Sequence, residues 1–453
     1  MVLRATHAGP ADLFALHLLA PDDYPFLLQS AEIGDGLRFP GTKSESVPNF
    51  SGRYDILFAF PGPVLDAGSG DFFRALSDAA RALATAPETG LPFSGGWFLL
   101  AGYEAARHVE PRLRLPPSPF RLPELLAVRC PAAVIHDHQR NETHVLAEDD
   151  PAQLQRLQSD LARARGQAAF APPRGALVAS IREEPEHRFT GGVRRILDYL
   201  RAGDVFQVNL SRAWTGELAA GASAADLYAR LRVSNPAPFA GLASWRGTTV
   251  LSSSPERLVE MRGRQVQTRP IAGTRPRGDT ALADRQLQEQ LIASVKERAE
   301  HIMLIDLERN DLGRVCEPGS VMVSELMAVE TYAHVHHIVS NVRGRLRADA
   351  GPGEVLKAVF PGGTITGCPK VRAMEIIAEL EGVGRGPYTG AMGYLSRDGR
   401  MDLNILIRSL VCEDGRVTLR AGAGIVADSR PEAELAETRI KARGLLQAFG
   451  AAA

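Results

Sequence analysis

Thr268–Gly278 reads TRPIAGTRPRG, a stretch in which three arginines, two prolines and two glycines surround the small apolar pair Ile271 and Ala272. The segment before it, from Leu258 to Thr268, is typical of a β-hairpin whose turn lies at Arg262–Arg264. Arginines beside free backbone N–H groups form an anion cradle in many proteins. The same arginines are also typical of structural or surface charges, so the stretch by itself leaves both interpretations open.

The length of the chain sets the scale of the fold. At 453 residues it exceeds one ordinary hydrophobic core, so we expect two domains or one large compound domain. A proline-rich interruption at 170–175 is the better of two candidate boundaries. It separates an N-terminal region, residues 1–175, from a second region, residues 176–453, that carries the catalytic motifs described below.

Bulk composition excludes several classes of function. With 45% hydrophobic and 23% charged residues and a net charge of -1, the chain is typical of a soluble globular protein, and its charge favours neither nucleic acid nor a membrane. It shows no signal peptide and no apolar run long enough to span a bilayer, so we expect a cytoplasmic protein. The four cysteines lie too far apart for a zinc site and indicate reduced thiols: Cys130, Cys316, Cys368 and Cys412.

Strands and helices both occur, without regular alternation. Helical spacing predicts helices at about 188–202, 287–304, 352–359, 369–381 and 431–448. Alternating apolar residues predict strands at about 54–60, 96–103, 205–211, 248–253, 388–395 and 403–411. This mixture indicates an α+β fold.

Two of the predicted helices place carboxylates on one face. Glu297 and Glu300 are three residues apart in the first, and Glu434, Glu437 and Lys441 share a face of the second. Spacing alone favours solvated faces with ordinary ion pairs. The sharper interpretation is that the two carboxylate pairs meet and hold a hard cation. Mg²⁺ fits, because it commonly takes one or two carboxylates together with waters and substrate oxygens.

Two glycine-rich stretches offer backbone to an anion. Phe360–Lys370, FPGGTITGCPK, precedes a predicted helix whose N-terminus attracts carboxylates or phosphates, and it matches neither the Walker A loop nor the dinucleotide fingerprint. Ala421–Ile425, AGAGI, either lets a ligand approach the backbone or is only a tight strand bend. Arg408 lies in the apolar run Ile405–Ser409, which reads as a buried strand. Its guanidinium therefore needs an anionic partner, and a bidentate carboxylate fits.

His337 alternates with apolar neighbours in the run that follows Val335. A hydrogen-bonded core histidine is our default interpretation of this pattern. General acid–base catalysis is the alternative.

Taken together, six motifs resemble the chorismate-utilising enzymes, the family of the anthranilate, aminodeoxychorismate, isochorismate and salicylate synthases. The similarity runs from about Glu186 to Gly444. It is carried by SPE at Ser254–Glu256, PIAGT at Pro270–Thr274, KERAEH at Lys296–His301, DLERND at Asp306–Asp311, TITGCPK at Thr364–Lys370 and ETRIK at Glu437–Lys441. The resemblance implies a compound α+β chorismate-binding fold with two large facing antiparallel sheets and helices outside, into which the N-terminal region also folds.

The resemblance also implies roles for individual residues. Glu256 corresponds to the general acid–base for the departing ring hydroxyl, and His337 to the histidine beside the ring. Glu300 and Glu437 correspond to the principal Mg²⁺ ligands, which would bind the metal at the ring carboxylate of chorismate. Glu297 and Glu434 would support them. The substrate's carboxylates and enolpyruvyl arm would be held by Thr274, Thr366, Tyr388, Arg408, Lys441 and the backbone of Gly422, Ala423 and Gly424.

Two positions bear on the nucleophile. Water-using members of the family carry a lysine in the strand that reads QVNLS here, and this chain has Gln207 in its place. An amide does not deprotonate water, so we expect ammonia as the nucleophile. The usual aminodeoxychorismate loop reads PIKGT, with a lysine that adds covalently to the ring, whereas anthranilate synthases read PIAGT. Ala272 taken alone therefore favours anthranilate synthase.

Other segments favour the aminodeoxychorismate branch. They are QVNLS at Gln207–Ser211, RYDIL at Arg53–Leu57, FPGGTITGCP at Phe360–Pro369 and MDLNILIR at Met401–Arg408. Anthranilate synthases more often show QVVLS, PAGTxSGAPK and MDTAIAIR. We therefore expect an aminodeoxychorismate synthase component I without the covalent lysine, in which ammonia displaces the hydroxyl directly or another nucleophile adds first. Anthranilate synthase component I is the main alternative, and a catalytically dead regulatory subunit that binds chorismate or tryptophan is the third.

The resemblance extends to partners. No segment resembles a fused amidotransferase, so we expect ammonia from a separate glutaminase subunit. Tyr24–Ser30, YPFLLQS, resembles the LLES-type segment of the family's tryptophan pocket, and Asn235 and Pro236 complete that pocket. Gln29 stands where relatives have an acid, which leaves feedback inhibition by tryptophan and a structural or vestigial pocket equally open.

Overall fold

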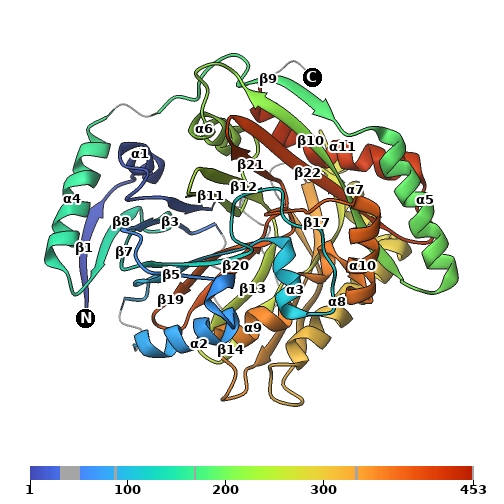
Figure 1. Cartoon of the computed structure of the whole chain (residues 1–453), viewed down its shortest axis with the longest axis horizontal. Coiled ribbons are helices and arrows are strands. Elements are labelled where there is room, and N and C mark those ends of the chain that lie inside the picture. The colour runs from blue at the N-terminus through green and yellow to red at the C-terminus, as the bar shows by residue number, and fades with distance from the viewer. Residues whose placement is uncertain (31–51, 86–88, 168–169, 332–334, 451–453) are drawn as a thin grey trace.

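Two antiparallel sheets organise the computed structural model, which describes residues 1–30, 52–85, 89–167, 170–331 and 335–450 (Figure 1). The first, a 12-stranded sheet, has the order β1 (Val2–Ala8), β8 (Glu142–Glu148), β7 (Ala132–Asp137), β3 (Tyr54–Ala59), β2 (Phe26–Gln29), β11 (Phe239–Trp245), β12 (Thr248–Ser254), β21 (Ser409–Glu413), β22 (Arg416–Ile425), β10 (Gln207–Leu218) and β18 (Gly367–Cys368), with β9 (Val178–Glu183) beside β10.

The second, a 10-stranded sheet, carries the stretch that opened the sequence analysis. Its order is β15 (Ile271–Pro276), β17 (Val335–Arg345), β14 (Gln265–Thr268), β13 (Arg257–Arg262), β20 (Met401–Ile405), β19 (Ala391–Ser396), β5 (Gly96–Ala101), β6 (Leu125–Cys130) and β4 (Val64–Asp66), with β16 (Met322–Thr331) beside β17. The predicted hairpin is confirmed as β13 and β14. Neither sheet is built from one side of residue 175 alone.

Helices pack on the outside of both sheets (Figure 1). Those against the 12-stranded sheet or its helices are α1 (Leu13–Leu19), α4 (Pro151–Arg165), α5 (Glu186–Ala202), α6 (Ala224–Ser234), α10 (Lys370–Glu381) and α11 (Pro431–Ala448). Those against the 10-stranded sheet are α2 (Phe72–Leu83), α7 (Ala281–Ala293), α8 (Val295–Gly313) and α9 (Pro352–Val359), and the short α3 (Ala106–Val109) follows β5. Within the described ranges, no helix has the length and apolarity that crossing a bilayer requires.

The two sheets face each other across an apolar core. Phe26 of the 12-stranded sheet stacks on Phe98 of the 10-stranded sheet, with 3.9 Å between ring centroids. Ile135 and Met392, again from opposite sheets, are buried in the same cluster. Burial of large apolar and aromatic side chains on both inner faces holds the layers together. The predicted α+β fold with two facing antiparallel sheets is therefore confirmed.

The chain passes from one sheet to the other at several places, and two of these crossovers are neighbours. β12 leads into β13 through Glu256, and β20 leads into β21 through Arg408. The two crossovers are hydrogen-bonded to each other: the Ile405 N–H donates to the Glu256 carbonyl at 3.0 Å, and the Ser253 N–H donates to the Arg408 carbonyl at 3.1 Å. The single strand predicted at 403–411 is therefore wrong. Its apolar run is continuous because both halves are buried, each in a different sheet.

The helix predicted at 287–304 is also two helices. Ser294 has an extended backbone, ends α7 and caps α8, with its hydroxyl accepting from the Glu297 N–H at 3.3 Å. Serine is a favoured N-cap because its side chain satisfies an N–H that the helix leaves unpaired. The break places Glu297 and Glu300 in the first turns of α8, next to β15 and β17.

Candidate active site

Glu256 lies at the first crossover, directly after Pro255, which has no N–H to continue the ladder. Glu256 is only 5% exposed, and within the described part of the chain its Oε1 has no hydrogen-bond partner. Burial raises the pKa of Glu256 to about 7, against smaller opposite effects of Thr364, Ile271 and the cations nearby. A substantial fraction of this carboxyl is therefore protonated at neutral pH, as a general acid requires.

Arg408 lies at the second crossover, half-buried and in the left-handed region with φ 54°. It is not part of a strand, which corrects our sequence interpretation. Its guanidinium makes no hydrogen bond or ion pair with the described residues, and burial lowers its pKa. Electrostatic interactions with Tyr388, Glu256 and Glu437 raise the pKa of Arg408 and so oppose the effect of burial. A guanidinium that lacks a bonded partner among the described residues is suited to a carboxylate ligand.

Helix α8 connects the two sheets through its carboxylates. Glu300 accepts a hydrogen bond from the Gln207 side chain of β10 at 2.8 Å. Glu297 pairs with Arg275 of β15 at 3.2 Å. Gly273 lies at φ 72°, and a Cβ there would come within 3.0 Å of the Glu297 carboxylate. Glycine therefore lets the PIAGT segment approach α8 closely.

Helix α11 reaches the same region from the other side. Glu437 pairs with Lys441 at 2.6 Å, and Lys441 donates to the Gly422 carbonyl of β22 at 3.1 Å. Glu434 is buried and Glu437 is exposed. The shared helical face is confirmed, and so is the predicted ion pair four residues apart. The side chain of Lys296, the other predicted pairing partner, lies outside the described residues.

The glycines of β22 make room for the side chains that meet here. A Cβ on Gly422 would come within 2.7 Å of the Asn209 oxygen and 3.0 Å of the Tyr388 hydroxyl, and one on Gly424 within 2.4 Å of the Gln207 amide. The strand runs through this segment paired with β10, so the glycines allow close approach rather than a bend. Ala423, between them, is buried in the apolar core on the opposite face.

His337 and Thr274 are partners across β15 and β17. Their side chains are hydrogen-bonded at 2.9 Å, between the threonine Oγ1 and the histidine Nδ1. Burial lowers the pKa of His337 to about 4, so the ring is neutral at physiological pH. Our default interpretation, a hydrogen-bonded buried histidine, is confirmed. Ala272, two positions before Thr274, is buried and paired with Ile338 in the same ladder.

Thr366 is fully buried beside β10. Its hydroxyl donates to the Gly362 carbonyl at 2.9 Å, and its own carbonyl accepts from the Asn209 N–H at 2.9 Å. The hydroxyl thus closes the glycine-rich loop, and the carbonyl joins that loop to β10. α10 begins at Lys370, directly after this loop, as predicted.

The arginines of Thr268–Gly278 are already paired with carboxylates. Arg269 binds Glu325 at 2.7 Å and also contacts Glu330, and Arg277 binds Asp284 at 2.9 Å. Arg275 binds Glu297, as described above. These arginines serve as structural charges, which decides against the anion cradle.

Glu300 and Glu437 carry the type of oxygen ligand that a hard cation such as Mg²⁺ takes. Through Gln207 and Lys441, Glu300 and Glu437 are both tied to the site-facing side of β22. In the described ranges, no three His, Cys, Asp or Glu side chains lie close enough to hold a metal. Mg²⁺ does not need three, because it usually retains waters and takes oxygens from an anionic substrate.

Sequence reasoning assigned no role to Asn209, which the structure brings to this site. It lies two residues from Gln207 on one face of β10, is 9% exposed, and its Oδ1 has no partner among the described residues. The period of two along a strand was the available signal. Sequence reasoning also assigned no role to Glu308 of the DLERND motif, whose side chain is buried. Burial raises its pKa to about 8, against the nearby charge of Lys370.

A separate cavity collects the residues of the predicted tryptophan pocket. It has a volume of about 450 Å³, and Ser30, Asn235 and Pro236 line it together with Asp55. Gln29 donates to Asp55 at 2.9 Å, and so does the Ser30 backbone N–H, also at 2.9 Å. β3 therefore supplies a carboxylate next to the position where the sequence lacks one.

Comparison with known proteins identifies the family of the chain. A family model described as chorismate binding enzyme matches residues 55–447. The chain belongs to the chorismate binding enzyme family. Its match starts in β3 and ends in α11, so family similarity extends to both sides of residue 175.

Individual members of the family resemble the whole chain. Anthranilate synthase component 1 of Streptomyces coelicolor is 41% identical over 97% of this chain and 86% of that protein. Aminodeoxychorismate synthase component 1 of Bacillus subtilis is 37% identical over 93% of this chain and 91% of that protein. The crystal structure of anthranilate synthase component I from Streptococcus pneumoniae matches with a TM-score of 0.78 and 32% identity, covering 90% of this chain and 95% of that one. This chain is therefore a chorismate-utilising enzyme of the anthranilate or aminodeoxychorismate synthase component I type.

Proposed function

We propose that this chain is an aminodeoxychorismate synthase component I, which converts chorismate and ammonia into 4-amino-4-deoxychorismate and water. Asn209 carries the proposal. Anthranilate synthases more often have valine at its position in the QVNLS strand, and here the carboxamide lies beside Gly422 and the Tyr388 hydroxyl. This position, beside residues that the proposal assigns to the substrate, supports the aminodeoxychorismate branch.

The proposed reaction uses the two crossovers together. Arg408 holds a substrate carboxylate, because its guanidinium is otherwise without a bonded partner among the described residues. Protonated Glu256 gives its proton to the ring hydroxyl, which leaves as water while the C–N bond to ammonia forms. The resulting ammonium group returns a proton to the Glu256 carboxylate. Neutral His337, fixed by Thr274, lies beside the ring as a hydrogen-bonding group.

Mg²⁺ completes the proposed site. Glu300 and Glu437 would hold it, with Glu297 and Glu434 in support, and when bound it neutralises the ring carboxylate of chorismate. Gln207 and Lys441 orient the two principal carboxylates through the contacts described above. Such outer contacts fix the direction of metal ligands.

Ammonia would come from a separate glutamine amidotransferase, a partner that the name component 1 of the relatives suggests. Gln207 supports ammonia rather than water as the nucleophile, because its amide offers no base at the position where water-using members carry lysine. Ala272 leaves no lysine for a covalent intermediate, so we propose direct displacement by ammonia.

A product assay tests the proposal. The purified chain is incubated with chorismate, Mg²⁺ and ammonium salt. We expect a product that becomes 4-aminobenzoate only after a downstream lyase is added. Fluorescent anthranilate formed by this chain alone would reject the proposal in favour of the second candidate.

That second candidate, anthranilate synthase component I, has two observations in its favour. Ala272 gives the PIAGT form of the loop, and most of the relatives are named anthranilate synthase. The variant Ala272→Lys tests whether the PIAGT loop faces the substrate ring. If Ala272 faces the ring, the new lysine forms a covalent adduct that mass spectrometry detects, whereas an unmodified and fully active variant would place Ala272 away from the substrate.

We also propose tryptophan as the ligand of the cavity beside Ser30. Asp55 offers a carboxylate for its ammonium group, and Asn235 and Pro236 lie in the same wall. Isothermal titration should show binding that Asp55→Asn weakens at least about tenfold, as expected for loss of one charge-assisted contact. Equal affinity in the variant would contradict this placement.

A further inference from the structure

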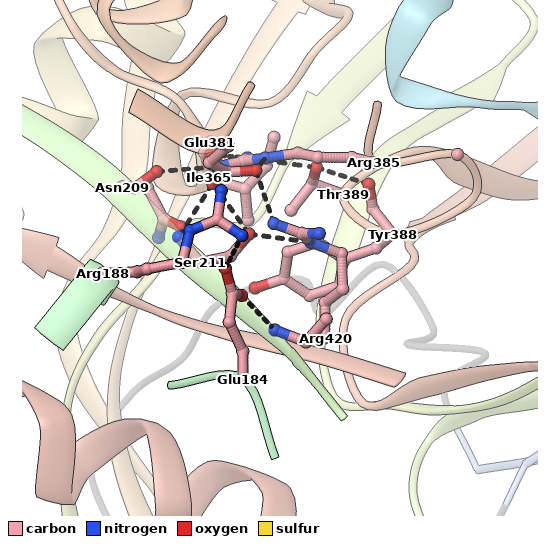
Figure 2. A network of polar contacts seen from close by, with 12 residues as sticks. Glu184, Arg188, Asn209, Ser211, Ile365, Glu381, Arg385, Tyr388, Thr389 and Arg420 are labelled. Atoms are coloured by element: carbon pink, nitrogen blue, oxygen red, sulfur yellow. Dashed lines mark hydrogen bonds and ion pairs between the residues drawn. The ribbon is translucent and has the colours of Figure 1, made fainter. Parts of the chain in front are cut away.

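A buried polar network lies behind the β10 side of the site (Figure 2). It consists of Ser211, Glu381, Arg385, Thr389 and Arg420, which we call the Arg385 network. Arg385 and Glu381 are 1% and 5% exposed. None of its members is assigned a role in the reaction proposed above.

Arg385 ties together three separate segments. Its guanidinium donates to the Asn209 carbonyl at 2.7 Å, to the Ile365 carbonyl at 3.2 Å and to the Thr389 hydroxyl at 3.3 Å. Each acceptor belongs to a site residue or is next to one. Asn209 itself faces the site, Ile365 precedes Thr366, and Thr389 follows Tyr388.

Glu381 fixes the direction of the guanidinium. Its carboxylate accepts from Arg385 at 2.6 and 3.1 Å, in a paired contact. The same carboxylate accepts from the Ser211 N–H at 2.9 Å and from Arg420 at 2.7 Å. Arg420 is two residues before Gly422 on β22, so the network includes a fourth site-bearing segment.

We propose that Arg385, held by Glu381, is a positioning residue for the chorismate site. It sets the relative places of Asn209, Thr366 and Tyr388 without contacting the substrate. A planar guanidinium suits this task, because its donors point along fixed directions to several acceptors at once. Burial excludes water that would otherwise compete for the three acceptors. The proposal rests on the proposed function in that it takes these residues as the substrate-facing groups.

Steady-state kinetics of Arg385→Gln test the proposal, with chorismate consumption as the readout so that the identity of the product does not matter. We expect a higher KM for chorismate and a kcat/KM lower by about a hundredfold, the cost of misplacing site groups by roughly 1 Å. Arg385→Lys should recover part of this loss, because it keeps the charge and some donors. A purely structural role would change the thermal unfolding temperature and leave the KM of the folded enzyme unchanged.

Arg212→Gln is the matched control. Arg212 is next to Ser211 on β10, is fully buried, and pairs with Glu183 at 2.5 Å and with the Glu184 carbonyl, neither of which is a site residue. The Arg212→Gln variant should be less stable than wild type and have an unchanged KM for chorismate. If Arg385→Gln does not fold, Thr389→Ala replaces it, since this variant removes one acceptor and keeps every charge.

The proposal is overturned if Arg385→Gln, or Thr389→Ala in its place, matches the Arg212→Gln control in kcat/KM. Calorimetric titration with chorismate repeats the comparison as an affinity. An enzyme that binds chorismate but makes no aminodeoxychorismate would refute the proposed function alone, because the affinity difference between the variants would remain.

Discussion

In the proposed reaction, the protonation of Glu256 links catalysis to pH at a single residue. Because burial raises its pKa to about 7 in the free enzyme, the acid form is lost as pH rises through 7, and kcat/KM for chorismate should fall over that range. Glu256→Gln cannot donate the proton and should lower kcat by about 10²- to 10⁴-fold. A pH profile of kcat and of kcat/KM in wild type and variant measures both effects. A wild-type profile that is flat from pH 6 to 8 would contradict the assignment.

The same residue should oppose stability in alkaline solution. Its folded-state pKa, about 7, exceeds the ordinary value of 4.5, so the stabilisation from holding the proton is complete below 4.5 and is lost as pH rises to 7. At pH 8 the buried carboxylate costs on the order of 3 kcal/mol. Glu256→Gln should therefore unfold at a higher temperature than wild type at pH 8, with the difference shrinking toward pH 4 in calorimetric scans.

The metal assignment can be tested at two further residues. Glu300→Gln and Glu437→Gln should each raise the Mg²⁺ concentration for half-maximal turnover. The increase should exceed about 10- to 100-fold, which is the usual effect of losing a residue that only hydrogen-bonds to a metal ligand. Glu432→Gln is the control, since Glu432 is exposed on the same helix as Glu437 and, among the described residues, pairs with Arg194 alone at the surface. Mg²⁺ titration of activity measures all three. Two variants with unchanged Mg²⁺ response would remove the assignment.

At the scale of the element, the break between α7 and α8 places the carboxylates. Ser294→Ala removes the N-cap of α8 and should cost about 1 kcal/mol of stability. It should also weaken the Mg²⁺ response, because the lost hydrogen bond comes from the backbone of Glu297. Ser294→Asp should restore both.

Thr280 provides the matched control, since it caps α7 by accepting from the Ala283 N–H at 3.2 Å. Thr280→Ala should lose similar stability in urea unfolding and keep the wild-type Mg²⁺ response. An equal change in Mg²⁺ response in the two alanine variants would show that the cap acts only through general stability.

At the scale of the whole molecule, both sheets draw strands from residues 1–175 and from residues 176–453. A fragment of residues 176–453 would lack β5, β6 and β4 of one sheet and five strands of the other, exposing two unpaired edges and the apolar face around Met392. We expect this fragment to be insoluble or to lack a cooperative unfolding transition, whereas the full chain unfolds in one transition. A soluble, cooperatively folded fragment would establish residue 175 as a true domain boundary.

The sequence by itself determined the family, the fold class and most of the local elements. The hairpin of β13 and β14, the helix that begins at Pro431 and the shared face of Glu434 and Glu437 follow from turn residues, capping and helical period. These signals act between residues close in the chain, and so the sequence alone is enough to predict them.

Only the tertiary structure decided what depends on residues far apart in the chain. It separated one apparent strand into β20 and β21, which the sequence could not do because an apolar run is buried in the same way in either sheet. It also placed Glu256 and Arg408 at adjacent crossovers. It also showed that Arg269 is neutralised by Glu325 and Glu330, 56 and 61 residues away, while Arg408 is not paired within the described residues. The sequence supplies the charges, and the pairing of distant segments decides which charge is left for a ligand.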